Sequence, residues 1–344
     1  MTRVLVIGAS QIGRALTVPL GDRGHKIFLL PARIDPDEKI ISQRLSTLAI
    51  PAHRAMSMVT YSEACELASS LDLTVIAVNS LGFEGAMKLI LSLPAEGTPV
   101  LILTKGLRAS SGGISSFAEI LGRSLKNARR ASTPILALGG PYVAMEVAKR
   151  RRTRVVVAGE KANSERVIGL LNTEYLSLTH APDLRSSCMA GALKNLYAVV
   201  TGIAVGQEVP RGARAPLSRA KNLSAAVFTQ SIQEMKLVLE TFSADSRVLF
   251  SLSGVGDFFV TCGIGRNHEA GLLLGRGVSV AEAEVGYLRH QTIEGLNLCR
   301  ELAPIIERCM REGLLEPRRI PLLRFAIETI RVGRAGQIPW RELG

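Results

Sequence analysis

The stretch "RVLVIGASQIGRALTVPLGDRGH", Arg3 to His25, predicts the fold of the first half of the chain. Its opening, residues 3–8, is a short β-branched apolar run that stops at a glycine, as a buried strand does. The residues that follow repeat apolar side chains at helical spacing, with Ile12, Leu16 and Leu20 on one face. The order strand, turn, helix is typical of the start of a parallel α/β sheet.

Five more apolar runs follow, at residues 26–30, 73–78, 99–104, 134–140 and 154–159. Helical or irregular segments separate most of them, and this alternation predicts a largely parallel sheet covered on both faces. From about residue 183 onward helical periodicity dominates, over 190–205, 223–241, 292–311 and 321–332. We therefore expect a Rossmann-type α/β domain over residues 1–182 and an all-helical domain over residues 183–344.

The composition indicates a compact protein without a disulfide framework or a metal site. The 344 residues are 47% hydrophobic and include 32 glycines. The five cysteines contain no CxxC pair, and the five histidines have no HExxH spacing, so we expect no metal. The N-terminal residues resemble a strand rather than a signal peptide, and no uninterrupted apolar run approaches the ~18 residues of a membrane span. We therefore expect a cytoplasmic protein.

The charge balance favours small anionic partners. The 42 lysines and arginines exceed the 30 acidic residues, for a net charge of +12, which suits phosphorylated metabolites or nucleotides. Aromatic residues make up only 4% of the chain, too few for the stacking surfaces that single-stranded nucleic acid needs. The densest basic run, residues 148–154, is more typical of a solvated turn, so we expect no nucleic-acid partner.

The first turn, "GASQIG" at residues 8–13, carries two of the three glycines of a GxGxxG dinucleotide fingerprint. Ser10 replaces the middle glycine, which would let the backbone approach a pyrophosphate. The N–H groups at the start of the helix would still attract a phosphate, and the alternative is an ordinary turn without a ligand. The candidate cofactor residues of this turn are Gly8, Ser10, Gln11, Ile12 and Gly13.

The segment "PARIDPDE", residues 31–38, stands where the ribose partner of a dinucleotide is expected. Arg33 suits the 2′-phosphate of NADP, whereas Asp35 would accept a hydrogen bond from the 2′-hydroxyl of NAD. We favour NADP on the strength of Arg33, with a surface loop of mixed charges as the alternative.

The stretch "AGALKNLYAVVTGIAV", residues 190–205, places a lysine in an almost wholly apolar helix. Lysine is almost never fully buried without a partner. Lys194 therefore either extends its ammonium to water along an apolar stem or directs a partly desolvated ammonium into a cleft.

A glycine-rich loop, residues 251–271, combines close backbone approach with polar side chains. Arginine there would bind a phosphate through paired hydrogen bonds, although such a loop can also be a simple turn. Its polar members are Asp257, Thr261, Arg266 and Asn267.

With "LTKGL" (103–107), "LGGPYVAME" (138–146) and "QTIEG" (291–295), these motifs resemble the NAD(P)-dependent glycerol-3-phosphate dehydrogenase family. The motifs occur in the family's order over about residues 3–330. The resemblance implies an oxidoreductase that interconverts dihydroxyacetone phosphate and glycerol 3-phosphate. It implies that the first domain binds NAD or NADP, that the helical domain binds the small phosphorylated substrate, and that the protein is a homodimer.

The resemblance also implies residue roles. Lys194 would be the proton donor and acceptor at the reacting oxygen, Asp257 would fix its direction, and Lys105 would be a second active-site cation. Cofactor contacts are implied for Lys105, Ala144, Arg266, Gln291 and Glu294. Substrate contacts are implied for Lys105, Gly140, Tyr142, Asn195, Thr261, Gly265, Arg266 and Asn267.

Several residues depart from the family pattern. Tyr142 replaces a small hydroxyl residue and would narrow a substrate pocket; the other departures are Ser10, Asn79, Cys188 and Gln230. They leave open a specialised paralogue that reduces another small anionic ketone. A non-catalytic nucleotide-binding module is a further alternative, although such a module has little use for a buried lysine.

Overall fold

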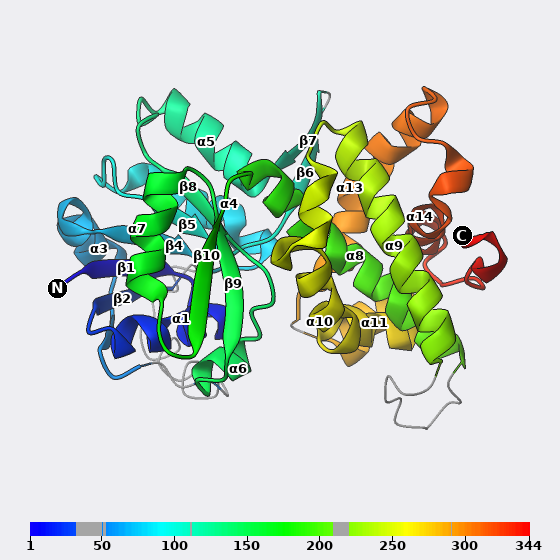
Figure 1. The fold of residues 1–344 in the computed structure, drawn as a ribbon, viewed down its shortest axis with the longest axis horizontal. Helices are drawn as coiled ribbons and strands as arrows, with labels where there is room; N and C mark the ends of the chain where they lie inside the picture. Colours follow the sequence, from blue (N-terminus) through cyan, green and yellow to red (C-terminus); the bar gives the residue numbers. More distant parts are fainter. Residues whose placement is uncertain (32–49, 51–52, 111, 209–219, 290) are drawn as a thin grey trace. The chain divides into compact units, whose positions relative to one another are not determined.

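The computed structural model describes residues 1–31, 50, 53–110, 112–208, 220–289 and 291–344 (Figure 1). The chain forms two compact units. The first unit comprises Met1–Lys105 and Phe117–Cys188, and the second comprises Gly106–Ser116 and Met189–Gly344. The second unit therefore includes a short segment, Gly106–Ser116, that interrupts the first unit in the sequence.

An eight-stranded sheet forms the centre of the first unit, in the order β10-β9-β8-β5-β4-β1-β2-β3. All neighbouring strands are parallel except β8 and β9, so the prediction of a largely parallel sheet is confirmed. The strands are β1 (Arg3–Ile7), β2 (Lys26–Leu30), β3 (Met56–Met58), β4 (Leu73–Ile76), β5 (Val100–Ile102), β8 (Ile135–Gly139), β9 (Thr153–Ala158) and β10 (Leu176–Ala181).

The chain order reverses between β1 and β4. β1 pairs with β2 on one side and with β4 on the other, so the strands that follow β1 in sequence lie on both sides of it. Open α/β sheets bind ligands in the crevice beyond the carboxyl ends of the strands at such a reversal. The ends of β1 and β4 are therefore where a cofactor is expected.

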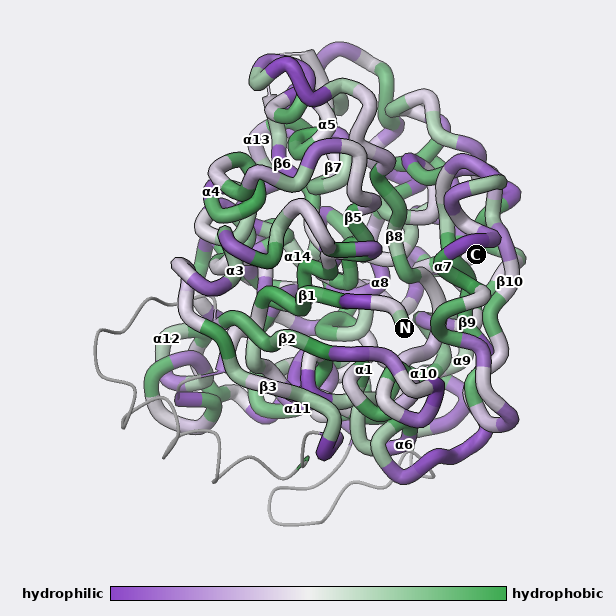
Figure 2. Tube along the Cα trace, turned by 90° about the vertical axis from the view of Figure 1, so that its left-hand side faces the viewer, coloured by the Kyte–Doolittle hydropathy of each residue, from purple (hydrophilic) through white to green (hydrophobic). Residues whose placement is uncertain are grey.

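Helices cover both faces of this sheet because the strands are apolar on both sides, as the hydrophobic colouring along β1, β5 and β8 shows (Figure 2). One face packs against α1 and α7, with Leu16 and Val167 in the shared core. The other packs against α3, α4 and α5, with Phe83 stacked on Phe117. The helices of this unit are α1 (Gln11–Asp22), α3 (Tyr61–Leu67), α4 (Phe83–Ser92), α5 (Phe117–Asn127), α6 (Ala144–Ala148) and α7 (Lys161–Leu171).

The second unit is mainly helical, as predicted. It adds one hairpin, β6 (Leu107–Ser110) and β7 (Gly113–Ser116), whose Ala109 N–H donates to the carboxylate of Glu301. Its helices are α8 (Leu184–Glu208), which begins at the end of the first unit, α9 (Lys221–Thr241), α10 (Asp257–Gly263), α11 (Arg266–Gly275), α12 (Val280–Glu282), α13 (Glu294–Arg311) and α14 (Pro321–Val332).

Within the described ranges, α8 is the one helix long and apolar enough to cross a membrane. However, 94% of its most apolar window is buried inside the protein. Core helices of globular proteins have this same composition when every face is covered by other elements.

Four strands have no counterpart among the predicted runs: β3, β6, β7 and β10. Three of them have only three or four residues, too few for an alternating pattern to emerge. β10 is a sheet edge with exposed positions, and it lacks the continuous apolar run of the inner strands.

Candidate functional site

Lys194 is buried and paired. Its side chain lies on α8 among apolar neighbours, and the residue is only 7% exposed. Its ammonium donates to Asp257 Oδ1 at 2.6 Å and to Thr261 Oγ1 at 2.5 Å. The interpretation in which Lys194 extends its ammonium to water is therefore wrong, because the ammonium contacts a carboxylate and a hydroxyl inside the protein.

Asp257 and Thr261 occupy successive turns of α10. The Thr261 hydroxyl donates to the Asp257 backbone carbonyl at 2.7 Å, so its oxygen accepts from the ammonium. Asp257 is 2% exposed and directly follows the short helical segment Leu252–Gly256. The pair is charge-assisted and holds the ammonium in one direction.

The neighbouring thiol of Cys262 is unreactive. Cys262 is buried, and burial raises the pKa of its thiol to about 12, although the Lys194 charge opposes that shift. The sulfur lies 3.6 Å from the Thr201 hydroxyl. A thiol with so high a pKa is not a nucleophile near neutral pH.

An amide cluster joins three helices of the second unit. Asn267 Nδ2 on α11 donates to Asn195 Oδ1 on α8 at 2.9 Å. Asn267 Oδ1 accepts from the Gly295 N–H at the start of α13, also at 2.9 Å. Both asparagines are 8% exposed. The hydrogen bond from Asn267 thus fixes the orientation of the Asn195 amide, whose NH2 group is a potential donor to a ligand.

Arg266 begins α11 and is exposed. Gly265 precedes it at φ 101°, a backbone conformation that side chains rarely adopt, and supplies no side-chain cap to the helix. Arg266 therefore belongs to the helix end whose first-turn N–H groups can attract an anion.

The first turn of the first unit is tightly built. Gly8 has φ 115°, and a Cβ on Gly13 would lie 2.1 Å from the Gly8 carbonyl oxygen. Ser10 is the N-cap of α1, while Gln11 and Ile12 start the helix with exposed side chains. The turn therefore has the glycine geometry of a dinucleotide-binding loop at two of its three positions.

Lys105 and Gly140 meet at the carboxyl edge of the same sheet. Lys105 follows β5, and its ammonium donates to the Gly140 carbonyl, which follows β8, at 3.4 Å. Ala144 begins α6 and is half-buried. The sequence prediction that Lys105 stands near the ends of the strands is thus confirmed for its position.

Tyr142 is partly buried and packs against the hydrophobic cluster that α1 and α7 share with the sheet. Its hydroxyl is buried and has no hydrogen-bond partner among the described residues. Burial raises the pKa of this phenol above its ordinary value. Tyr142 as a residue is nevertheless only partly buried, and its expected narrowing of a substrate pocket stays a prediction.

Two further predicted cofactor residues lie just before and at the start of α13. Gln291 is exposed, and Glu294 begins α13 with a half-buried side chain. Arg33 and Asp35, on which the cofactor preference depends, lie outside the described residues.

Sequence reasoning missed a buried carboxylate, Glu234 on α9, which is fully buried. It accepts from the N–H groups of Leu322 and Leu323 at 2.8 and 2.7 Å and so caps α14. Gln230 Nε2 and the Tyr197 hydroxyl donate to it at 3.1 and 3.2 Å. Burial raises its pKa to about 7, against the effect of these hydrogen bonds. The available signal was the i, i+4 spacing of Gln230 and Glu234 on the face of α9 that also carries Val227 and Val238.

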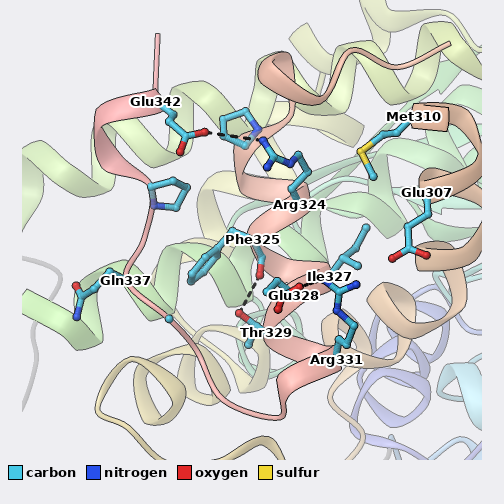
Figure 3. Close-up of a pocket in the computed structure, with 13 residues that line it drawn as sticks. Glu307, Met310, Arg324, Phe325, Ile327, Glu328, Thr329, Arg331, Gln337 and Glu342 are labelled. Carbon is cyan, nitrogen blue, oxygen red and sulfur yellow. Dashed lines mark hydrogen bonds and ion pairs between the residues drawn. The ribbon is translucent and has the colours of Figure 1, made fainter. Parts of the chain in front are cut away.

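A groove of about 530 Å³ lies along α14 and the C-terminal residues of the second unit (Figure 3). None of the predicted site residues lines it. Polar groups in it already contact one another: Arg324 lies 4.0 Å from Glu342, Arg331 pairs with Glu328, and the Thr329 hydroxyl donates to Phe325. The groove is therefore no candidate for the site described above.

Comparisons with known proteins agree with the motif order. A model of the NAD-dependent glycerol-3-phosphate dehydrogenase N-terminus matches residues 3–165, and one of the C-terminus matches residues 183–330. A glycerol-3-phosphate dehydrogenase [NAD(P)+] of Saccharophagus degradans is 29% identical over 303 residues, which is 86% of this chain and 79% of that protein. An NADP(+)-dependent glycerol-3-phosphate dehydrogenase of Archaeoglobus fulgidus is 30% identical, over 81% of this chain and 82% of that protein.

Solved structures show the same fold. Glycerol-3-phosphate dehydrogenase from Coxiella burnetii superposes with a TM-score of 0.78 at 22% identity, over 99% of this chain and 97% of the other. The enzyme from Saccharomyces cerevisiae gives 0.76 at 18% identity, with the same coverage. With both halves matched by the family models, the chain belongs to the NAD-dependent glycerol-3-phosphate dehydrogenase family.

Proposed function

We propose that this protein reduces dihydroxyacetone phosphate to sn-glycerol 3-phosphate, reversibly, with NAD(P)H as the hydride source. The observation that carries the proposal is the buried ammonium of Lys194, held between Asp257 and Thr261. The activity for which the relatives from Saccharophagus degradans and Archaeoglobus fulgidus are named supports it.

Lys194 is the general acid in the direction of reduction. The reduced nicotinamide, when bound, supplies a hydride to the carbonyl carbon. As that carbon gains the hydride, the carbonyl oxygen gains negative charge, and an ammonium at hydrogen-bond distance stabilises and protonates it. Lys194 then regains a proton from solvent, and in the reverse direction its neutral amine accepts the hydroxyl proton. Asp257 and Thr261 keep the amine in one orientation throughout.

The second unit holds the phosphorylated substrate in this proposal. Arg266 and the N–H groups at the start of α11 bind the phosphate, next to the turn at Gly265. Asn195 donates its NH2 group to a substrate oxygen, in the orientation that the hydrogen bond from Asn267 gives its amide. Asn267 is thereby a positioning residue as well as a candidate ligand contact.

The first unit binds the dinucleotide at its first turn, where Gly8 and Gly13 allow the tight backbone path. Residues 1–182 would thus serve the cofactor and 183–344 the substrate. Lys105 supplies a second cation near the strand ends, and Gly140, Ala144, Gln291 and Glu294 are further contact candidates. NADPH is the favoured donor, because Arg33 suits a 2′-phosphate and one relative is named NADP(+)-dependent.

We also infer a cytoplasmic homodimer. Exposed aromatic side chains on the second unit, Phe250 at 82% and Phe259 at 73%, support a surface that a second copy covers. Sedimentation equilibrium across a range of protein concentrations tests this, and a single monomeric species at all concentrations would refute it.

The proposal is tested by following the reduced-nicotinamide absorbance band with dihydroxyacetone phosphate, separately with NADH and NADPH. A panel of small ketones and keto acids accompanies it, and a clear preference for an unphosphorylated acid would refute the substrate assignment. Salt-sensitive binding to DNA without any cofactor-dependent turnover would instead favour a non-catalytic module.

A further inference from the structure

The hydroxyl of Ser10 connects the ends of β1 and β4, between which the strand order of the sheet reverses. Ser10 lies in the turn after β1, and Ala77 directly follows β4. These are the two neighbouring strand ends beyond which a dinucleotide is expected. Ser10 Oγ donates to the Ala77 carbonyl oxygen at 2.8 Å, so one hydrogen bond links the two ends.

The same hydroxyl caps α1. Ser10 Oγ accepts from the Gly13 N–H at 3.4 Å. The N–H groups of Gln11 and Ile12 have no partner within the helix because they lie in its first turn. An incoming phosphate therefore competes with Ser10 for one of the three donors at this helix end.

The oxygen of Ser10 does not assist a phosphate in this orientation. Its single hydrogen already goes to Ala77, and the lone pairs that remain would repel an anion. The backbone of the turn also lies close to the end of β4, because a Cβ at Gly8 would lie 2.6 Å from the Ala77 carbonyl oxygen. In the dinucleotide fingerprint the middle glycine lets the backbone approach the pyrophosphate, whereas Ser10 adds a Cβ and an oxygen there.

We propose that Ser10 is a determinant of cofactor affinity that competes with the dinucleotide pyrophosphate for the start of α1 and so weakens its binding. This inference rests on the proposed function, since it assumes that the cofactor binds at the first turn. NAD and NADP share the pyrophosphate, so the proposed effect applies to both cofactors.

The test measures the dissociation constants of NADH and NADPH for the full chain by titration calorimetry, at one fixed ionic strength. Ser10→Gly removes both the Cβ and the hydroxyl and keeps a residue that is acceptable at an N-cap. Ser10→Ala removes only the hydroxyl. Thr60→Ala is the matched control, because Thr60 is likewise an N-cap hydroxyl, on α3 of the same unit.

We expect Ser10→Gly to bind both cofactors about fivefold more tightly, the effect of one competing hydrogen bond. The dissociation constants of Ser10→Ala should lie between those of Ser10→Gly and those of the unsubstituted chain. Thr60→Ala should leave both constants unchanged. Unchanged or weaker binding by Ser10→Gly would overturn the inference, as would weaker binding by Ser10→Ala, which would mean that the hydroxyl donates to the phosphate.

Failure of this inference is distinguishable from failure of the proposed function. If the unsubstituted chain turns over dihydroxyacetone phosphate and Ser10→Gly binds NADH and NADPH no more tightly, only the proposed role of Ser10 is refuted. If neither form binds either cofactor, both proposals fall. Binding by Ser10→Gly alone would support the role of Ser10.

Discussion

Lys194 Nζ lies 2.6 Å from Asp257 Oδ1, and neither residue is more than 7% exposed. Removing one member of such a pair leaves the other charge buried without its partner, which destabilises a protein by about 3–5 kcal/mol. The pair therefore has two separable consequences. One concerns the reaction and the other concerns folding.

Replacement of the lysine should abolish most of the turnover. Because Lys194→Ala removes the proposed proton donor, we expect the kcat for dihydroxyacetone phosphate to fall by about 10² to 10⁴, with little change in cofactor affinity. Lys194→Met, which keeps the apolar stem, serves as a second variant if the alanine chain does not fold. Lys161→Ala is the control, since that lysine is 74% exposed. A nearly normal rate in a folded Lys194 variant would contradict the assignment.

Arg266 should act on substrate binding more than on the chemical step. Loss of a charged hydrogen-bond donor to a phosphate is worth about 1.5–3 kcal/mol, so Arg266→Ala should raise the KM for phosphorylated substrate by roughly 10- to 100-fold. Arg247→Ala in the same unit is the control, because its guanidinium is 90% exposed. An unchanged KM in the Arg266 variant would place the phosphate elsewhere.

Glu234 should make the stability of the protein depend on pH. Its folded pKa is about 7, above the ordinary 4.5, because burial penalises the carboxylate. Between these values the folded chain binds more protons than the unfolded chain, so this group's contribution to stability is full below pH 4.5 and is lost as pH rises to about 7. The total loss is about 3 kcal/mol.

Urea unfolding at several pH values across this window measures the slope. Glu234→Gln should flatten it, whatever its effect on the absolute free energy of unfolding. Glu165→Gln provides the comparison, because Glu165 has a side chain that is 59% exposed. An equal slope in the Glu234 variant and the unsubstituted chain would exclude Glu234 as the source.

Two tyrosines of the first unit should respond oppositely to loss of the hydroxyl. Tyr142→Phe removes a buried hydroxyl that has no partner among the described residues, so we expect the free energy of unfolding to rise by about 1 kcal/mol. Tyr175→Phe breaks the 2.7 Å hydrogen bond from its hydroxyl to Asp22, and should lower that free energy by about 1 kcal/mol. Thermal or urea unfolding compares the two, and destabilisation by Tyr142→Phe would reveal a partner for that hydroxyl.

Local patterns were enough to predict the architecture and to single out Lys194. The apolar runs 3–8, 26–30 and 73–78 became β1, β2 and β4, because a strand buried on both faces needs continuous apolar residues. The helical spacing after residue 183 became α8, α9, α13 and α14. Lys194 was evident as a charge inside an apolar helix. Each of these signals lies within a window of a few turns or one strand.

Only the tertiary structure determined which residues, far apart in the sequence, contact each other. Lys194 meets Asp257 across 63 residues, Ser10 meets Ala77 across 67, and Glu234 caps a helix 88 residues away. Periodicity reports which face of an element is buried, but it contains no information about which distant element covers that face. The same holds for Tyr142, because its sequence position does not show that the residue packs against the core cluster of the first unit.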